Sequence, residues 1–268
     1  MSTRFDRDTA VNPVSEDHFE ARIDPGWWIV RGPNGGYLAA ILVRAMEQRI
    51  GDPDRSLRSL NVHYLRPPKE GAATIRTRIE RTGRGLSTIT ARLEQDGVVQ
   101  AIAMAAFAKS RGGPAFAHAE RPEFPPPGEC PGRDSHPIPF HARFDTRTAL
   151  GPRTFDGTGK TREAVTGGWI RIAEPRPVDA ALLAAYADAW PPAVFATTEL
   201  PPLTGGVPTV DLTVHVRTPL PLDLAHDEFV LVLFRTRHVQ DGFLEEDGEI
   251  WSQDGRLLAH ARQLGVAL

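Results

Sequence analysis

A dense group of prolines divides the chain near its middle. Eight of the 24 prolines fall between residues 114 and 139: Pro114, Pro122, Pro125, Pro126, Pro127, Pro131, Pro137 and Pro139. Proline donates no backbone N–H and restricts the conformation of the residue before it. Residues 113–139 are therefore predicted to form neither a helix nor a central strand. They indicate a semi-extended linker between two units, with a long surface loop inside a single domain as the alternative.

Both sides of this linker show a helix followed by several strands. Hydrophobic periodicity predicts one helix over residues 36–49 and another over residues 178–190. Strand-like runs follow the first helix at residues 60–66, 72–81, 87–95 and 98–108. In the second half such runs lie around residues 140–149 and 168–173, and then at residues 207–217, 228–237, 242–252 and 256–264. A long helix against an antiparallel sheet, occurring twice, predicts the α+β class.

A local echo supports a duplication. Gln95-Asp96-Gly97 and Gln253-Asp254-Gly255 each stand between two apolar-rich runs near the end of their half. Asp-Gly in that setting is typical of a tight hairpin. The shared order of elements adds to this match, and 268 residues suffice for two small units. We therefore expect tandem repeats at residues 1–112 and 140–268, joined by the linker.

Composition excludes several classes of function. Lys and Arg number 31 against 34 Asp and Glu, so the chain has no broad field to attract nucleic acid or an anionic membrane. Its single cysteine, Cys130, cannot form an internal disulfide. No apolar run approaches the ~20 residues of a membrane span, and the first residues show no signal-peptide pattern. We therefore expect a cytoplasmic protein with neither nucleic-acid nor membrane partners.

The sequence also lacks the motifs of several catalytic classes. It has no G-x-S-x-G turn for a serine nucleophile and no G-x-G-x-x-G for a dinucleotide. Its nine histidines form no H-x-x-x-H or H-x-H pair, and one cysteine cannot build a thiolate site. We therefore expect no metal and no cofactor, which leaves chemistry by activated water.

Three polar residues of the second half are candidates to activate a water. Asp188 lies on the predicted helix 178–190, away from its apolar stripe and beside several alanines. Periodicity alone favours a solvated carboxylate there, and the alternative is a carboxylate held in a cleft that the small alanines open. Thr209 lies on the polar face of the strand 207–217, and Gln263 shares a strand face with two alanines. Both positions fit either an outer sheet face or the lining of a site.

A glycine-rich turn, Gly32-Pro33-Asn34-Gly35-Gly36-Tyr37, leads into the first predicted helix. It can serve simply as a turn and helix entry, for which glycine is permissive. Alternatively, free N–H groups at the helix N-terminus can bind an oxyanion or a phosphate. The backbone amides of Gly36 and Tyr37 are the candidates for that second role.

Several segments in this order resemble the bacterial acyl-CoA thioesterase II family and its thioesterase-like relatives. They are Gly32-Pro33-Asn34-Gly35-Gly36-Tyr37, His63-Tyr64-Leu65-Arg66-Pro67, Ala185-Tyr186-Ala187-Asp188, Pro208-Thr209-Val210-Asp211, Gln253-Asp254-Gly255 and Gln263-Leu264-Gly265. The resemblance extends over nearly the whole chain. It implies a double hotdog fold, in which two tandem hotdog repeats each wrap an antiparallel sheet around a long central helix.

The resemblance also implies the site. In that family an aspartate on the second helix, a threonine on the next strand and a glutamine near the end of the chain jointly hold the attacking water. By position these resemble Asp188, Thr209 and Gln263. The chain departs from the family pattern at Leu212 and Leu264, where the family usually has histidine and glutamate. Counting eight residues from each Asp-Gly glycine places Ala105 opposite Gln263 in the first half, so one complete site is expected per chain.

The implied activity is hydrolysis of an acyl-CoA thioester to a free acid and CoA, with Asp188 as the general base. Gly36 and Tyr37 would then bind the oxyanion. A non-catalytic acyl-CoA-binding or assembly module with the same fold is the main alternative. A hotdog-type enoyl-CoA hydratase is disfavoured because Asn12-Pro13 is the only Asn-Pro and precedes every predicted helix. Because hotdog sheets often extend by edge pairing, we expect a homodimer or a higher homo-oligomer.

Overall fold

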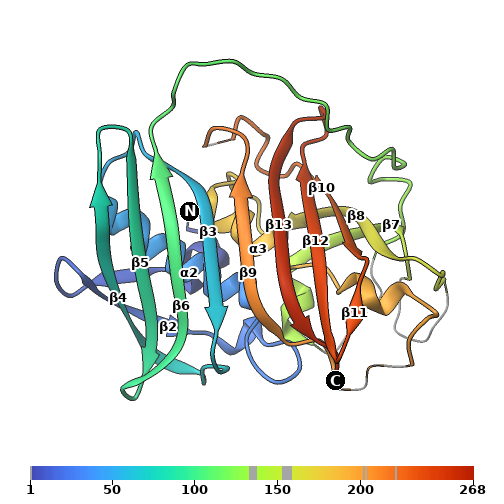
Figure 1. Ribbon diagram of the computed structural model, residues 1–268, viewed down its shortest axis with the longest axis horizontal. Helices are drawn as coiled ribbons and strands as arrows, with labels where there is room; N and C mark the ends of the chain where they lie inside the picture. Colours follow the sequence, from blue (N-terminus) through green and yellow to red (C-terminus); the bar gives the residue numbers. More distant parts are fainter. Residues whose placement is uncertain (1, 133–137, 153–158, 202, 204, 221) are drawn as a thin grey trace.

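The longest described helix, Gly35–Ile50, and a long antiparallel sheet determine where the polar residues of the chain meet. The computed structural model describes residues 2–132, 138–152, 159–201, 203, 205–220 and 222–268. Within these residues, 13 strands form one sheet in the order β1-β2-β4-β5-β6-β3-β9-β13-β12-β10-β8-β7, with β11 paired to β12. The sheet lies across the front of the molecule in Figure 1, and the helices α2 and α3 lie behind it.

Each half of the chain contains helices in its first part and ends in a run of strands. The first half contains α1 (Arg4–Asp8), β1 (Val11–Pro13), β2 (His18–Ile23), the 3-10 helix η1 (Pro25–Trp27), α2 (Gly35–Ile50), β3 (Ser56–Tyr64), β4 (Gly71–Thr82), β5 (Leu86–Gln95) and β6 (Val98–Ala108). The second half contains η2 (Pro139–Arg143), β7 (Phe144–Leu150), β8 (Ala164–Ile172), α3 (Ala180–Tyr186), η3 (Ala193–Ala196), β9 (Thr209–Val216), β10 (Val230–Thr236), β11 (Val239–Gln240), β12 (Phe243–Trp251) and β13 (Leu257–Val266).

The strands form where side chains alternate between a buried and an open face. Along β5, Ile89, Ala91 and Leu93 are buried while the residues between them are more open, as expected for a sheet with one covered face. The buried face of the sheet packs against α2. Asn34 caps the N-terminus of α2 by accepting from the backbone amide of Tyr37, and Gly51 ends the helix in the left-handed region.

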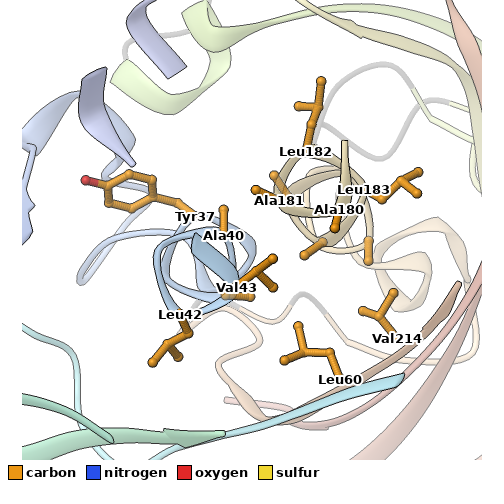
Figure 2. Close-up of a cluster of buried hydrophobic side chains, with 14 of the residues drawn as sticks. Tyr37, Ala40, Leu42, Val43, Leu60, Ala180, Ala181, Leu182, Leu183 and Val214 are labelled. Atoms are coloured by element: carbon orange, nitrogen blue, oxygen red, sulfur yellow. The ribbon is translucent and has the colours of Figure 1, made fainter. Parts of the chain in front are cut away.

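The two halves of the sheet meet between β3 and β9, which lie side by side in the middle of Figure 1. Their register pairs Leu60 with Val214. Asn61 strengthens the junction because its amide nitrogen donates to the Thr213 hydroxyl at 2.8 Å. Leu60 and Val214 point from the sheet toward α2 and α3, whose apolar side chains face one another in Figure 2. The core is therefore continuous across the junction of the two halves.

The described part of the proline-rich segment before Pro139, where η2 begins, has no helix or strand, in keeping with its composition. It is nevertheless held against the second half, because the Trp169 indole donates to the Pro125 carbonyl at 2.8 Å. Cys130 is buried beside Trp169 and Trp251, so its role is packing. Residues 133–137 of the segment lie outside the described residues.

Most predicted strands agree with the structure to within a few residues, but three expectations need correction. The predicted helix 178–190 ends at Tyr186, because the amides of Asp188 and Ala189 bond three residues back and tighten the chain into a turn. The start of the predicted strand 140–149 is the 3-10 helix η2, and the strand β7 begins at Phe144. The first 23 residues, for which no element was predicted, contain α1, β1 and β2.

Candidate active site

The carboxylate of Asp188 lies against the N-terminus of α2. The Asn34 amide nitrogen donates to Asp188 Oδ2 at 2.8 Å, and the Gly36 backbone amide donates to the same oxygen at 2.9 Å. The Asn34 amide also donates to the Asp188 carbonyl at 2.7 Å. Asp188 is therefore not a solvated carboxylate on the outer face of a helix. It is partly buried in the turn after α3, against residues more than 150 positions earlier in the chain.

Two glycines allow this close approach. A Cβ added at Gly36 would lie 2.8 Å from the Ala185 carbonyl oxygen and 3.0 Å from Asp188 Cβ. A Cβ at Gly35 would lie 3.0 Å from Asp188 Oδ2. At Gly36 the contact is with backbone and cannot be relieved without moving it, whereas at Gly35 the side chains of Asp188 and Tyr64 would have to shift. The small residues of α3 and the glycines of α2 together bring the two helices close enough for the hydrogen bonds.

The position of Asp188 changes its acidity. Burial raises its pKa to about 6, against the opposing effect of the Gly36, Gly35 and Asn34 hydrogen-bond donors. The N-terminus of a helix also favours a negative charge. Asp188 is therefore ionised near neutral pH and is a stronger base than an ordinary aspartate. This combination suits a group that takes a proton from water.

Tyr64 completes the surroundings of Asp188. Its hydroxyl donates to the Gly35 carbonyl at 2.7 Å and so ties β3 to the start of α2. Burial and the nearby charges of Asp188 and Asp211 hold the pKa of Tyr64 well above its usual value. The phenol stays neutral and remains a hydrogen-bond donor. Tyr64 belongs to a segment that carries the family resemblance, but its link to Gly35 was not predicted.

Thr209 and Gln263 meet directly. The Thr209 hydroxyl, at the start of β9, donates to Gln263 Oε1 at 2.9 Å. On its other side, Gln263 Nε2 donates to Glu246 Oε1 at 2.6 Å. Glu246 and Gln263 are cross-strand partners on β12 and β13, and both are buried. The three side chains therefore form a continuous hydrogen-bonded relay across three neighbouring strands.

Glu246 links this relay to the segment that follows Asp188. Its second oxygen accepts a hydrogen bond from the Ala193 backbone amide, in the segment that follows Asp188. Burial raises the pKa of Glu246 to about 7, and the negative charge of Asp188 adds to the rise. Glu246 was not among the residues predicted from the sequence. The signal was present, because alternation along β12 places this carboxylate on the same buried face as Leu244 and Ile250.

Gly36 and Tyr37 have partners that differ from the expected oxyanion. The Gly36 amide donates to Asp188, and the Tyr37 amide donates to the Asn34 side chain at 3.0 Å. The Tyr37 ring is buried and stacks on Trp27, and its hydroxyl lies 2.8 Å from the Asp8 carbonyl. In this structure the two amides hold Asp188 and cap α2, and their oxyanion role stays a prediction.

The described residues contain no group of three or more His, Cys, Asp or Glu side chains arranged to hold a metal ion. None of the helices in the described part of the chain combines the length and apolar character that crossing a membrane requires.

Similar solved structures include three that align over almost the full chain. A conserved protein with a hotdog fold from Alicyclobacillus acidocaldarius is 28% identical, with a TM-score of 0.89 and coverage of 100% of this chain and 99% of that one. A thioesterase II candidate from Thermobifida fusca is 29% identical, with a TM-score of 0.84 and coverage of 99% and 98%. An acyl-CoA thioesterase II from Mycobacterium marinum is 20% identical, with a TM-score of 0.79 and coverage of 98% of both chains. These likenesses establish the hotdog fold.

The family models agree with the fold. The model of the acyl-CoA thioesterase N-terminal domain matches residues 24–108, and the model of the acyl-CoA thioesterase C-terminal domain matches residues 118–267. Comparison with curated protein sequences finds no match. The two models together span most of the chain, in the order expected of one family member. The chain therefore belongs to the acyl-CoA thioesterase family, a family of thioester hydrolases.

Proposed function

We propose that the protein hydrolyses acyl-CoA thioesters to a carboxylic acid and CoA, with Asp188 as the general base toward water. The observation that carries the proposal is the setting of the Asp188 carboxylate. It has a raised pKa, and the donors that hold it, Asn34 and Gly36, are uncharged. A carboxylate has about four acceptor positions, so these bonds leave room for a water. Membership of the acyl-CoA thioesterase family supports acyl-CoA thioesters as the substrate class.

In the proposed reaction the water oxygen bonds to the thioester carbon while Asp188 takes a proton from that water. The tetrahedral intermediate then collapses, the carbon–sulfur bond breaks, and the proton passes to the CoA sulfur. The products are the free acid and the CoA thiol, and Asp188 returns to its ionised form. A positioned base of this kind typically contributes about 10²–10⁴-fold to the rate.

Thr209 and Gln263 are proposed to orient the water. The Thr209 hydroxyl donates a hydrogen bond to Gln263, so its oxygen can accept a hydrogen bond from the water. Gln263 uses one amide hydrogen for Glu246 and can direct the other at the water oxygen. The water would then donate to Asp188 and Thr209 and accept from Gln263. One of its lone pairs stays free to attack the thioester.

We propose one such site per chain. At the register of the Gln263–Glu246 pair, the first half has Ala105 paired with Ile89. Both first-half residues are buried and apolar, so they cannot orient a water. The wider proposals are a double hotdog with repeats at residues 1–112 and 140–268 around the linker 113–139, and a homo-oligomer acting in the cytoplasm.

The test is a thiol-release assay with acyl-CoA substrates of graded chain length, together with thermal unfolding in the presence of each one. Turnover of at least one substrate supports the proposal. Stabilisation by acyl-CoA without any release of thiol would instead support a binding or assembly module and contradict the proposed hydrolysis. Asp247 on β12 offers a matched control for charge, because its carboxylate pairs with Arg262 and Arg237 on the exposed side of the strand. D247N is expected to keep its rate within about twofold, as exposed ion pairs contribute little.

A further inference from the structure

Glu246 has a setting that packing does not explain. Only 2% of its surface is exposed, and it lies on the apolar face of β12 between Leu244 and Gly248. Within the described residues no salt bridge compensates its charge. Burying a carboxylate without a cation is costly unless hydrogen bonds hold it. An apolar residue here would stabilise the core better, as Ile89 does at the matching register of the first half.

The hydrogen bonds of Glu246 have a defined direction. Both of its oxygens face donors: Ala193 donates its backbone N–H to one, and Gln263 donates its amide N–H to the other at 2.6 Å. An ionised carboxylate only accepts, so Gln263 must turn its NH₂ group toward Glu246. The carbonyl oxygen of Gln263 then faces Thr209, whose hydroxyl donates to it at 2.9 Å.

We propose that Glu246 is a positioning residue that fixes the side-chain amide of Gln263, and through it the direction in which the Thr209 hydroxyl donates. The inference rests on the proposed function. With Glu246 ionised, the Thr209 oxygen is free to accept a hydrogen bond from the attacking water. If the amide were reversed, Gln263 would donate to Thr209, and the Thr209 hydroxyl would donate to the water. The water would then lose the Thr209 acceptor that orients its second hydrogen in the proposed reaction.

Protonation of Glu246 would reverse the direction of the hydrogen bonds that run from Thr209 through Gln263 to Glu246. A neutral carboxyl has one O–H donor, which must find an acceptor, and the Gln263 carbonyl oxygen becomes that acceptor when the amide turns. The charged groups that act on Glu246 are Asp188, across the site, and Glu245, next to it on β12, and both favour the protonated form. The residues of β10, β13 and η3 on the same side carry no charge: Phe234, Thr236, Ala261, Gly265, Ala193, Val194, Phe195 and Ala196.

The first arm of the test is a double-mutant cycle on kcat for an acyl-CoA substrate. E246Q keeps the shape of the side chain, but its amide has one acceptor oxygen where the carboxylate has two. We expect E246Q to lower kcat by up to about 100-fold with little change in KM. Because Glu246 acts through Gln263, E246Q should cost almost nothing further in a Q263A background. A merely structural role would cost the same in both backgrounds.

E245Q is the matched control. Glu245 lies on the same strand and accepts two backbone N–H bonds, from Arg237 at 2.8 Å and His238 at 2.9 Å, but it does not contact Gln263. This substitution removes a two-acceptor carboxylate from the other face of β12. We expect its kcat to stay within about twofold of the wild type, in line with substitutions away from a site.

The second arm does not depend on turnover. We expect the side-chain NH₂ signals of Gln263, assigned by their loss in Q263A, to shift with pH as Glu246 titrates. The shift should disappear in E246Q and persist in E245Q and D188N. If these signals are insensitive to pH in the wild type, or if E246Q costs as much in Q263A as alone, the inference is overturned while hydrolysis stands. If they titrate as expected but no acyl-CoA is hydrolysed, the proposed function fails and the link between Glu246 and Gln263 stands.

Discussion

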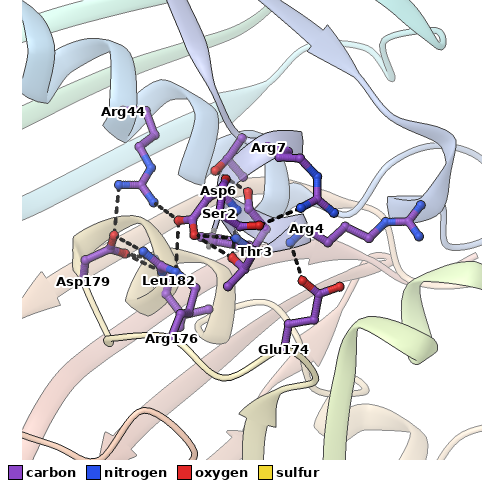
Figure 3. A network of polar contacts seen from close by, with 12 residues as sticks. Ser2, Thr3, Arg4, Asp6, Arg7, Arg44, Glu174, Arg176, Asp179 and Leu182 are labelled. Carbon is purple, nitrogen blue, oxygen red and sulfur yellow. Dashed lines mark hydrogen bonds and ion pairs between the residues drawn. The ribbon is translucent and has the colours of Figure 1, made fainter.

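Asp179 and Asp188 flank the same short helix, yet the pKa values of their carboxyl groups are shifted in opposite directions. Asp179 caps the N-terminus of α3 and is bound by two guanidinium groups, Arg176 at 2.6 Å and Arg44 at 2.9 Å (Figure 3). Asp188 follows the C-terminus and is bound by the amides of Asn34 and Gly36. Although burial acts upward on both, the arginines hold the pKa of Asp179 below its usual value, while that of Asp188 rises to about 6.

The two carboxylates are suited to different roles: Asp179 holds neighbouring segments together, and Asp188 is basic enough to take a proton. Ion pairs lock Asp179 into a network that also includes Asp6 of α1, so its charge ties the first residues of the chain to both helices. Its lone pairs are occupied by cations, and its basicity is low. Asp188 is oriented by neutral donors, which fix its geometry while leaving it basic. The chemical partner, rather than burial or helix position, decides which role an aspartate takes.

The largest expected effect is on turnover. D188N retains an oxygen that can accept from Asn34 and Gly36 but removes the basic group, so kcat should fall by about 10²–10⁴-fold with little change in KM. D179N should keep the kcat of the folded enzyme. Steady-state assays of both purified variants check this pair of outcomes. Loss of turnover in D179N without loss of folded protein would break the distinction.

A smaller loss is expected when the approach of the two helices is disturbed. G36A places a Cβ 2.8 Å from the Ala185 carbonyl oxygen, which pushes α2 away from the turn that carries Asp188. A displacement of about 1 Å can cost on the order of 100-fold in rate, and we expect a loss of that size in kcat. The control is G85A, where an added Cβ meets nothing within 4 Å. Equal rates for the two variants would argue that the helix contact does not position Asp188.

Stability should respond differently from turnover: D179N, which is expected to keep its kcat, should lose stability. D179N leaves Arg176 and Arg44 with weaker partners, and losing hydrogen bonds between charged groups costs about 1.5–3 kcal/mol. For a chain of this size that corresponds to a fall in Tm of roughly 3–5 °C. Differential scanning calorimetry at neutral pH measures the change. An unchanged Tm would show that the network around α1 does not contribute to stability.

The last expected effect is a pH-dependent gain in stability when Asp188 loses its charge. The pKa of Asp188 is higher in the folded state than its unfolded value of 3.8. Its stabilising contribution is therefore full below pH 3.8 and is lost as the pH rises through about 6. A rise in pKa from 3.8 to about 6 is worth up to about 3 kcal/mol, so D188N should exceed the wild type by no more than that at neutral pH and lose the advantage in acid. Asp179, with its lowered pKa, contributes above its unfolded value and loses that contribution as the pH falls. Urea unfolding at several pH values separates the two trends.

The sequence predicted what local pattern determines. The alternation in β5 and β6 and the Asp-Gly turns located the strands, because one buried face imposes a period of two. The helix α2 was also found, since its apolar residues and Gly51 mark its course and its end. The last turn of the second helix was not, because the chain tightens after Tyr186, where Asn34 binds the Asp188 carbonyl.

The candidate site was predictable in part. Asp188, Thr209 and Gln263 came from the family resemblance, whereas periodicity alone favoured a solvated Asp188. Its actual surroundings depend on α2, which no local pattern in the second half reveals. Glu246 could have been found as a carboxylate on an apolar strand face, but its bond to Gln263 required the register of β12 and β13. Contacts between segments far apart in the chain were therefore the main features that could not be predicted from the sequence.

The most direct test of the contrast is a titration of the two carboxyl groups by carbon-13 NMR, with D179N and D188N used to assign the signals. The pKa of Asp188 is expected near 6 and that of Asp179 below the usual aspartate value of 3.8. An Asp188 signal that titrates at or below 3.8 would contradict the account, because such a carboxylate is no better a base than the ion-paired Asp179.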